Sequence, residues 1–105
     1  TILAPEESAE SSEGGEIVEG IYIVPITDSV KADYGLPENI TGVAITKIDQ
    51  GSGFENYLRE GMVILEINGR AVNNMQDART SLLSGVNKLY IYDRGRTGFL
   101  AIRLP

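Results

Sequence analysis

The stretch from Met62 to Asn68 constrains the fold more than any other part of this 105-residue chain. It is the most hydrophobic run in the sequence, and the pair Asn68-Gly69 ends it. Asn-Gly is a strong signal for a two-residue hairpin turn, because both residues adopt a positive φ at little cost. A short apolar run that ends in such a turn predicts a buried β-strand. We therefore expect a fold built around a sheet.

Further strands and a first helix are expected on the N-terminal side of this run. Residues 17–26 are rich in β-branched side chains but contain Gly20 and Pro25, which predicts a strand close to a sheet edge. The alternation in residues 42–48 predicts another strand. Between them, a short helix is expected over residues 28–34, capped by an aspartate and stopped by a glycine and a proline.

The C-terminal part predicts one more helix and a closing hairpin. Asn73 or Asn74 caps a helix that runs to about Ser84, where Gly85 ends it. A short strand at residues 71–72 precedes this helix, and residues 88–93 and 98–104 pair around the turn at 94–97. The fold class expected is α+β and mainly β, a partly open β-barrel or sandwich of five or six short strands capped by two helices.

The acidity of the chain is confined to its N-terminal segment. The net charge is −6, but residues 1–16 carry five glutamates and no basic residue, so the other 89 residues are close to neutral. Low hydrophobicity and like charge predict an acidic flexible linker over residues 1–16, followed by one domain over 17–105. No positive field is available for nucleic acid, so we expect no nucleic-acid partner.

The residue types that are missing restrict the chemistry. The chain has no cysteine and no histidine, which removes thiolate zinc sites, the commonest metal ligand and the usual general base for a nucleophile. We therefore expect a non-catalytic domain with no catalytic residues, no metal and no cofactor. No stretch approaches the roughly 20 apolar residues of a membrane helix, so no membrane insertion is expected. Because the chain begins at Thr1 and not at methionine, we expect it to be a piece of a longer protein.

A combination of short motifs then points to a family. The motifs are Gly42-Val43-Ala44-Ile45, Gly51-Ser52, the run from Glu60 to Gly69, Val72, Asp77-Ala78 on the capped helix, and Tyr92-Asp93-Arg94-Gly95. Together they resemble a PDZ domain, and among PDZ domains those of HtrA/Deg serine proteases. The resemblance covers roughly residues 17–105. Two departures concern packing: Met62 stands where the family usually has Asp, and residues 54–57 replace a segment of smaller residues.

The resemblance implies a peptide-binding site. PDZ domains bind a peptide as an added strand along a sheet edge beside a helix, and a glycine-containing loop holds the peptide's terminal carboxylate. The segment that best matches this loop is Val18-Glu19-Gly20-Ile21, which leads into the expected edge strand at Tyr22 and Ile23. Gly20 and Ile21 suit the role. Glu19 does not, because its carboxylate would repel the guest's unless it turns to solvent.

The second half of the expected site lies on the predicted helix. Ala78 and Leu82 are four residues apart and face the core, which places Met75 and Arg79 along the groove. Leu82 would help to form the floor of a terminal pocket. Arg79 would pair with an acidic side chain of the peptide, or lie across the groove, or remain in solvent.

The resemblance implies a module that binds unfolded or C-terminal segments and regulates a protease domain on the same parent chain. The acidic linker favours the second PDZ domain of a tandem pair, and the family implies a periplasmic or cell-envelope location. An alternative is an assembly module that forms subunit contacts in a homo-oligomer, which Glu19 and Arg79 beside the groove would favour. A PDZ domain from another host, such as a secretion component or a tail-specific protease, is the third possibility.

Overall fold

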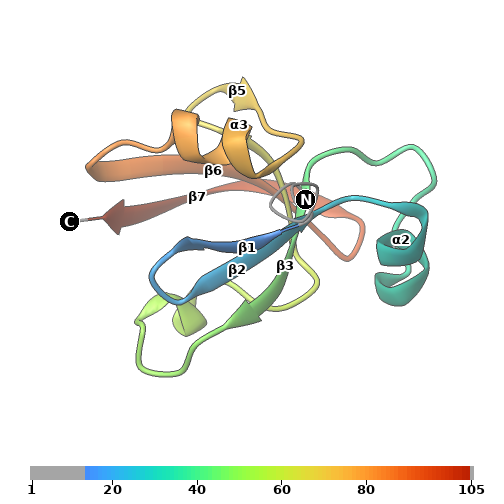
Figure 1. Cartoon of the computed structure of the whole chain (residues 1–105), viewed down its shortest axis with the longest axis horizontal. Coiled ribbons are helices and arrows are strands. Elements are labelled where there is room, and N and C mark those ends of the chain that lie inside the picture. The colour runs from blue at the N-terminus through green and yellow to red at the C-terminus, as the bar shows by residue number, and fades with distance from the viewer. Residues whose placement is uncertain (1–13, 105) are drawn as a thin grey trace, which may run out of the picture.

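The structure is a computed structural model that describes residues 14–104. These residues form seven strands, two α-helices and one 3-10 turn (Figure 1). The strands are β1 Gly15–Val18, β2 Ile21–Pro25, β3 Val43–Ile48, β4 Val63–Ile67, β5 Arg70–Ala71, β6 Gly85–Asp93 and β7 Arg96–Leu104. The helices are α2 Asp28–Tyr34 and α3 Met75–Ser81, and the 3-10 turn is η1 Phe54–Asn56. Neither α-helix within residues 14–104 is long and apolar enough to cross a membrane.

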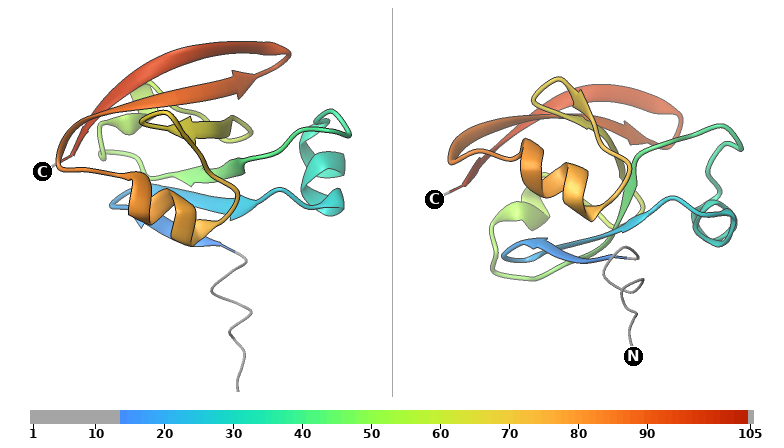
Figure 2. Two further views of the ribbon diagram at one scale, coloured as in Figure 1. Left: turned by 90° about the horizontal axis from the view of Figure 1, so that it is seen from above. Right: turned by 45° about the horizontal axis from the view of Figure 1, so that its top comes forward.

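All strand pairs are antiparallel and belong to one sheet. The order is β1-β2-β3-β4-β6-β7, and β5 pairs with β4 beside this path. The sheet curls, so that β1 and β2 lie across the core from β6 and β7, and α3 covers the opening between them (Figure 2). The α+β, mainly-β fold class is therefore confirmed, with seven strands in the described residues instead of the five or six expected.

The central strand prediction is confirmed. β4 lies inside the predicted run 62–68, and its residues Val63, Ile64 and Ile67 are buried. Asn68 and Gly69 have φ of 54° and 82°, which is the conformation expected of the two-residue turn. The buried side chains form one cluster, whose largest members are Ile21, Ile23, Ile45, Leu58, Ile67 and Leu89.

The prediction of one strand over residues 17–26 was wrong. The chain reverses at Glu19 and Gly20, so β1 and β2 form a hairpin. Gly20 adopts a φ of +95°, and a Cβ there would lie 2.6 Å from the Cβ of Ser52. Glycine is therefore required at this turn for both its conformation and its size. Since β1 begins at Gly15, the domain starts two residues earlier than expected, and residues 1–13 of the predicted linker lie outside the described residues.

Both predicted helices are present, with differences at their ends. α2 has the predicted extent and ends at Gly35 with φ of 64°, but its cap is Thr27, whose Oγ1 accepts a hydrogen bond from the N–H of Val30. α3 is capped by Asn74 as predicted, with Oδ1 accepting from the N–H of Asp77 at 2.8 Å. It ends at Ser81 and not at Ser84, because Leu82 is already extended.

The closing hairpin is longer than predicted. β6 and β7 have nine residues each and pair along their whole length, from Gly85 opposite Leu104 to Asp93 opposite Arg96. Arg94 and Gly95 both have positive φ, as a two-residue turn of this kind requires. Gly85, expected to end the helix, is the first residue of β6 instead.

Candidate functional site

An open pocket of about 850 Å³ lies at the tip of the β1–β2 hairpin. Its walls come from this hairpin turn, the segment that follows α3, the loop before and within η1, and the end of β7. Five of the nine predicted site residues line it: Val18, Glu19, Gly20, Arg79 and Leu82. The structure thus brings the predicted loop and the predicted helix side of the site together.

The pocket carries both signs of charge. Arg79 and Arg103 line it together with Glu19 and Asp49, so its four ionisable side chains sum to zero. Arg103 comes from β7 and was not among the predicted site residues, because its position depends on the pairing of β7 with β6. Leu82, Leu83 and Phe54 add apolar surface, and Leu83 is 61% exposed. Such a pocket can hold an apolar side chain next to a carboxylate.

The edge of β2 is not bare, which corrects the expected arrangement at Tyr22 and Ile23. β1 pairs with β2, placing Glu16 opposite Tyr22 and Gly15 opposite Ile23. α3 packs against both strands, with β1 next to it (Figure 1). The place expected for an added peptide strand is therefore occupied by residues 15–18 of the same chain.

Apolar side chains of β1 fill the space between β2 and α3. The register of the hairpin shifts between Glu16 and Val18, and both Ile17 and Val18 pack against the core. A β-bulge of this kind places an extra residue in one strand and changes the direction of its side chains. Ile21 and Ile23 are buried, at 2% and 0% exposure. The cavity left among these residues is only about 10 Å³, which is too small for a guest side chain.

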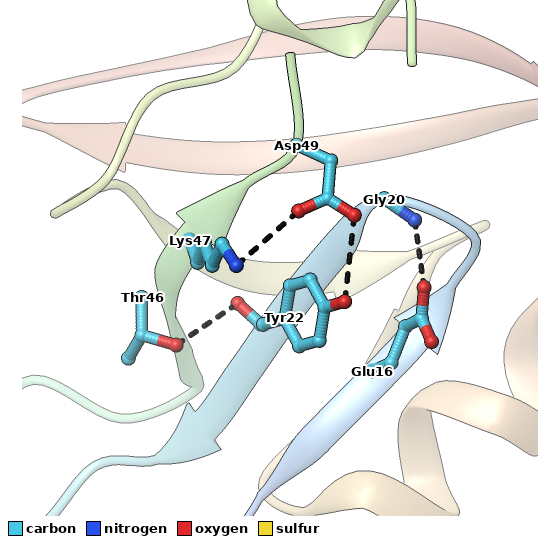
Figure 3. Close-up of polar contacts among 6 residues, drawn as sticks. All are labelled: Glu16, Gly20, Tyr22, Thr46, Lys47 and Asp49. Atoms are coloured by element: carbon cyan, nitrogen blue, oxygen red, sulfur yellow. Dashed lines mark hydrogen bonds and ion pairs between the residues drawn. The ribbon is translucent and has the colours of Figure 1, made fainter. Parts of the chain in front are cut away.

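The backbone of Gly20 is engaged within the domain. Its N–H donates to the Glu16 carboxylate at 2.9 Å (Figure 3). Its carbonyl accepts from the N–H of Asp49 at 2.8 Å. The N–H expected to bind a peptide's terminal carboxylate thus already has a carboxylate partner, which corrects the prediction of a free anion-binding loop. The Gly20 N–H is therefore unavailable to a guest while β1 is in place, and the Gly20 carbonyl is bonded to Asp49.

Tyr22 points to the outer side of the hairpin and not into the groove. Its hydroxyl donates to Asp49 at 3.4 Å, and the Lys47 ammonium lies 5.2 Å from its ring centroid (Figure 3). Lys47 also pairs with Asp49 at 3.5 Å. Desolvation raises the pKa of the Tyr22 hydroxyl, and the neighbouring Asp49 and Glu16 carboxylates raise it further. Tyr22 therefore remains a neutral phenol on the outer face.

Of the three site residues predicted on the helix, Met75 is buried, whereas Arg79 and Leu82, at the C-cap, line the pocket. Met75 is only 3% exposed and belongs to the core cluster, so it does not line an open groove as expected but lies covered by β1. Its methyl group lies 3.8 Å from the position of a Cβ on Gly15, beneath β1. Arg79 is exposed and lines the open pocket, while Leu82 borders both this pocket and the small cavity.

A pair of hydrogen-bonded asparagines, of which Asn87 is buried and Asn68 half-buried, fixes the end of α3, and sequence patterns alone did not indicate it. Asn87 has 0% exposure, and its Oδ1 accepts from Asn68 Nδ2 and from the N–H of Leu83, both at 2.8 Å. Its Nδ2 donates to the carbonyls of Leu83 at 2.7 Å and Gly85 at 3.2 Å. Asn68 Nδ2 also donates to the carbonyl of Ser81. These bonds end the helix and hold the segment from Leu82 onward at the pocket.

The opposite wall of the pocket is held by one carboxylate. Glu55 accepts hydrogen bonds from the N–H groups of Gly51 at 3.0 Å and Gly53 at 2.8 Å, and from the Ser52 hydroxyl at 3.2 Å. Its own backbone N–H and that of Gly51 are the main causes that lower the pKa of this carboxyl. Glu55 thus stabilises the loop as an anion.

No protein-family model matches this chain, and no curated protein matches it significantly. The resemblance to PDZ domains stays a prediction from the motif residues. Within residues 14–104, no group of three or more acidic, histidine or cysteine side chains lies close enough together to hold a metal ion.

Proposed function

We propose that this domain is a non-catalytic peptide-binding module of PDZ type, which takes an extended segment along β2 beside α3. The observation that carries the proposal is β1 itself. An extended four-residue segment is held at this position, paired antiparallel with β2 and packed against α3. Strand addition uses the same two elements, a sheet edge for backbone bonds and neighbouring side chains for selection.

The open pocket suits the end of such a segment. β1 runs toward the Glu19–Gly20 turn, so a guest in the same direction would place its C-terminal end where the pocket opens. Arg79 and Arg103 supply cations for a terminal or side-chain carboxylate, and Leu82 supplies apolar contact. Glu19 and Asp49 oppose the two arginines, so the preference for a carboxylate is expected to be modest.

A peptide-library screen tests the proposal. Each peptide is offered with a free and with an amidated C-terminus, and binding is measured by fluorescence anisotropy. We expect extended apolar peptides to bind, with about a fivefold loss on Arg79→Ala, since a solvent-exposed charge pair contributes about 1 kcal/mol or less. Arg70→Ala, on the exposed strand β5 away from the pocket, is the matched control. If no peptide binds the wild-type chain or any variant with a weakened β1, the proposal is wrong.

The resemblance to HtrA/Deg modules extends the proposal to a parent chain. We propose that the guest is an unfolded or C-terminal protein segment and that the module regulates a serine protease domain elsewhere on a longer chain in the cell envelope. The motif residues from Gly42 to Leu83 support this. Expression of the longer chain with and without the residues of this domain would test the coupling to proteolysis.

A second function, subunit assembly, is favoured by one surface. Val86 on β6 and Phe99 on β7 are 57% and 64% exposed, and Leu83 nearby is also exposed. β7 lies at the end of the sheet path opposite β1, so its nine residues form an edge that could pair with another chain. Light scattering of the chain, with Phe99→Ser as the comparison, distinguishes assembly from a monomeric peptide binder.

A further inference from the structure

β1 is bound to its own domain in the way that a guest strand would be bound. It pairs antiparallel with β2 and lies beside α3, and it runs in the direction expected of a peptide whose C-terminal end reaches the hairpin turn. Because the remaining cavity is about 10 Å³, a guest and β1 cannot occupy this place together. Any guest at β2 has to replace β1.

β1 is also held by fewer residues than the other outer strand. It has four residues, whereas β7 has nine, and its first two residues, Gly15 and Glu16, are exposed. Besides its backbone pairing with β2, its attachment depends on the apolar side chains of Ile17 and Val18 and on the bond from the Gly20 N–H to Glu16. Short edge strands of this kind open locally at low free energy compared with core strands.

We infer that β1 is an internal competitor for the peptide site and that its sequence defines the class of guest. This inference rests on the proposed function. The guest is an extended segment with a glutamate followed by two β-branched residues, as in Glu16-Ile17-Val18. Its glutamate takes over the N–H of Gly20, and its two β-branched side chains fill the space over Ile21 and Ile23. The domain is closed when β1 is bound and open to guests when β1 is displaced.

A disulfide lock across the hairpin tests the competition in the full chain. Glu16 and Tyr22 are directly opposite each other, and such antiparallel partners have Cα atoms about 4.5–5.5 Å apart, within the range of a disulfide. The chain has no cysteine, so the double substitution Glu16→Cys, Tyr22→Cys creates its only thiol pair. The matched control is Lys88→Cys, Ala101→Cys, a directly opposed pair in the β6–β7 hairpin outside the pocket.

The probe is an N-acetylated peptide copying residues 14–18, Gly-Gly-Glu-Ile-Val, with a free C-terminus. We expect the reduced lock variant to bind the probe, the oxidised form to bind at least tenfold more weakly, and the control pair to bind equally in both states. Equal binding by the oxidised and reduced lock would show that the guest does not replace β1 and would overturn the internal competition, while peptide binding by the domain would stand. Absence of binding by every form to every library peptide would instead refute the proposed function.

Single substitutions provide a second readout without thiols. Glu16→Ala removes one attachment of β1, so the probe is expected to bind about fivefold more tightly, equivalent to about 1 kcal/mol. Glu38→Ala, an exposed glutamate near α2, is the control and is expected to change nothing. A probe with lysine in place of its glutamate is expected to bind at least fivefold more weakly. If Glu16→Ala has no effect, or the lysine probe binds as well as the original, the inference about the guest class is wrong.

Discussion

Replacement of Asn87 by alanine is the sharpest test of how the pocket is positioned. The side chain is completely buried and makes four hydrogen bonds, two accepted at Oδ1 and two donated by Nδ2. One hydrogen bond contributes about 1 kcal/mol net, and leaving a buried partner unpaired costs about 1–3 kcal/mol. Asn68 retains its bond to the Ser81 carbonyl, and the bonds to the Leu83 backbone are only partly buried. We therefore expect a loss of about 3 kcal/mol in the free energy of unfolding.

Urea denaturation followed by far-ultraviolet circular dichroism measures this loss, because the chain has no tryptophan to report folding. In a thermal scan a loss of this size lowers Tm by about 12 °C or more for a domain of this length. The control is Asn39→Ala, an exposed loop position where a change of less than about 0.5 kcal/mol is expected. If Asn87→Ala and Asn39→Ala unfold at the same urea concentration, the Asn87 side chain does not hold the end of α3 and our reasoning is refuted.

An isosteric change at Asn87 separates the hydrogen bonds that its Oδ1 accepts from those that its Nδ2 donates. Asn87→Asp keeps both accepted bonds but loses the donor toward the Leu83 and Gly85 carbonyls. Burial raises the pKa of a carboxyl, so the folded variant binds its proton more tightly than the unfolded chain does. Its stability relative to wild type should therefore rise as the pH falls from neutral toward the unfolded pKa of about 3.9. A stability difference that is independent of pH would contradict this.

Two further predictions concern the walls of the pocket. Gly20→Ala should lower the free energy of unfolding by about 3 kcal/mol, because Gly20 has a positive φ and an added Cβ would lie 2.6 Å from the Cβ of Ser52. Gly95→Ala should lower it by about 1 kcal/mol, because Gly95 has a φ of +86° but open space around it. Urea titration of both variants measures the difference. Equal losses of stability in the two variants would exclude a steric contribution from Ser52. The lowered pKa of Glu55 means that its stabilising contribution is present above the ordinary value of 4.5 and is lost as the pH falls through the depressed folded pKa. The difference between wild type and Glu55→Gln should accordingly be larger at pH 7 than at pH 3, and a constant difference would refute this.

The features predicted correctly from the sequence depend on neighbouring residues. The strand ending at Asn68-Gly69 and the cap at Asn74 are both encoded within a few positions, through turn conformation and side-chain hydrogen bonds. The same local rules ended α2 at Gly35. For this reason the fold class could be predicted. The meeting of the Gly20 loop and Arg79 in one pocket was instead implied by the resemblance to PDZ domains.

The features that were missed depend on residues far apart in the chain or on a choice between similar local patterns. Residues 15–25 are compatible with one strand broken by glycine or with a hairpin, and the contacts of Gly20 with Ser52 and Asp49 decide between them. Asn87 reads as an exposed polar residue until Asn68 is brought beside it. Met75 was assigned to the groove because the helix face alone does not say that β1 covers it.

Under the proposed competition, the internal strand links the affinity of the domain for every guest to one equilibrium. The apparent dissociation constant equals the intrinsic constant divided by the fraction of molecules in which β1 is detached. If that fraction is about 1%, each guest binds about 100-fold more weakly than it would to an open groove. A change that detaches β1 more often, such as Glu16→Ala, must therefore tighten all guests by the same factor. A change in the pocket, such as Arg79→Ala, acts on guests according to their own charge. Comparing the two variants across several peptides thus separates release of the groove from recognition within it.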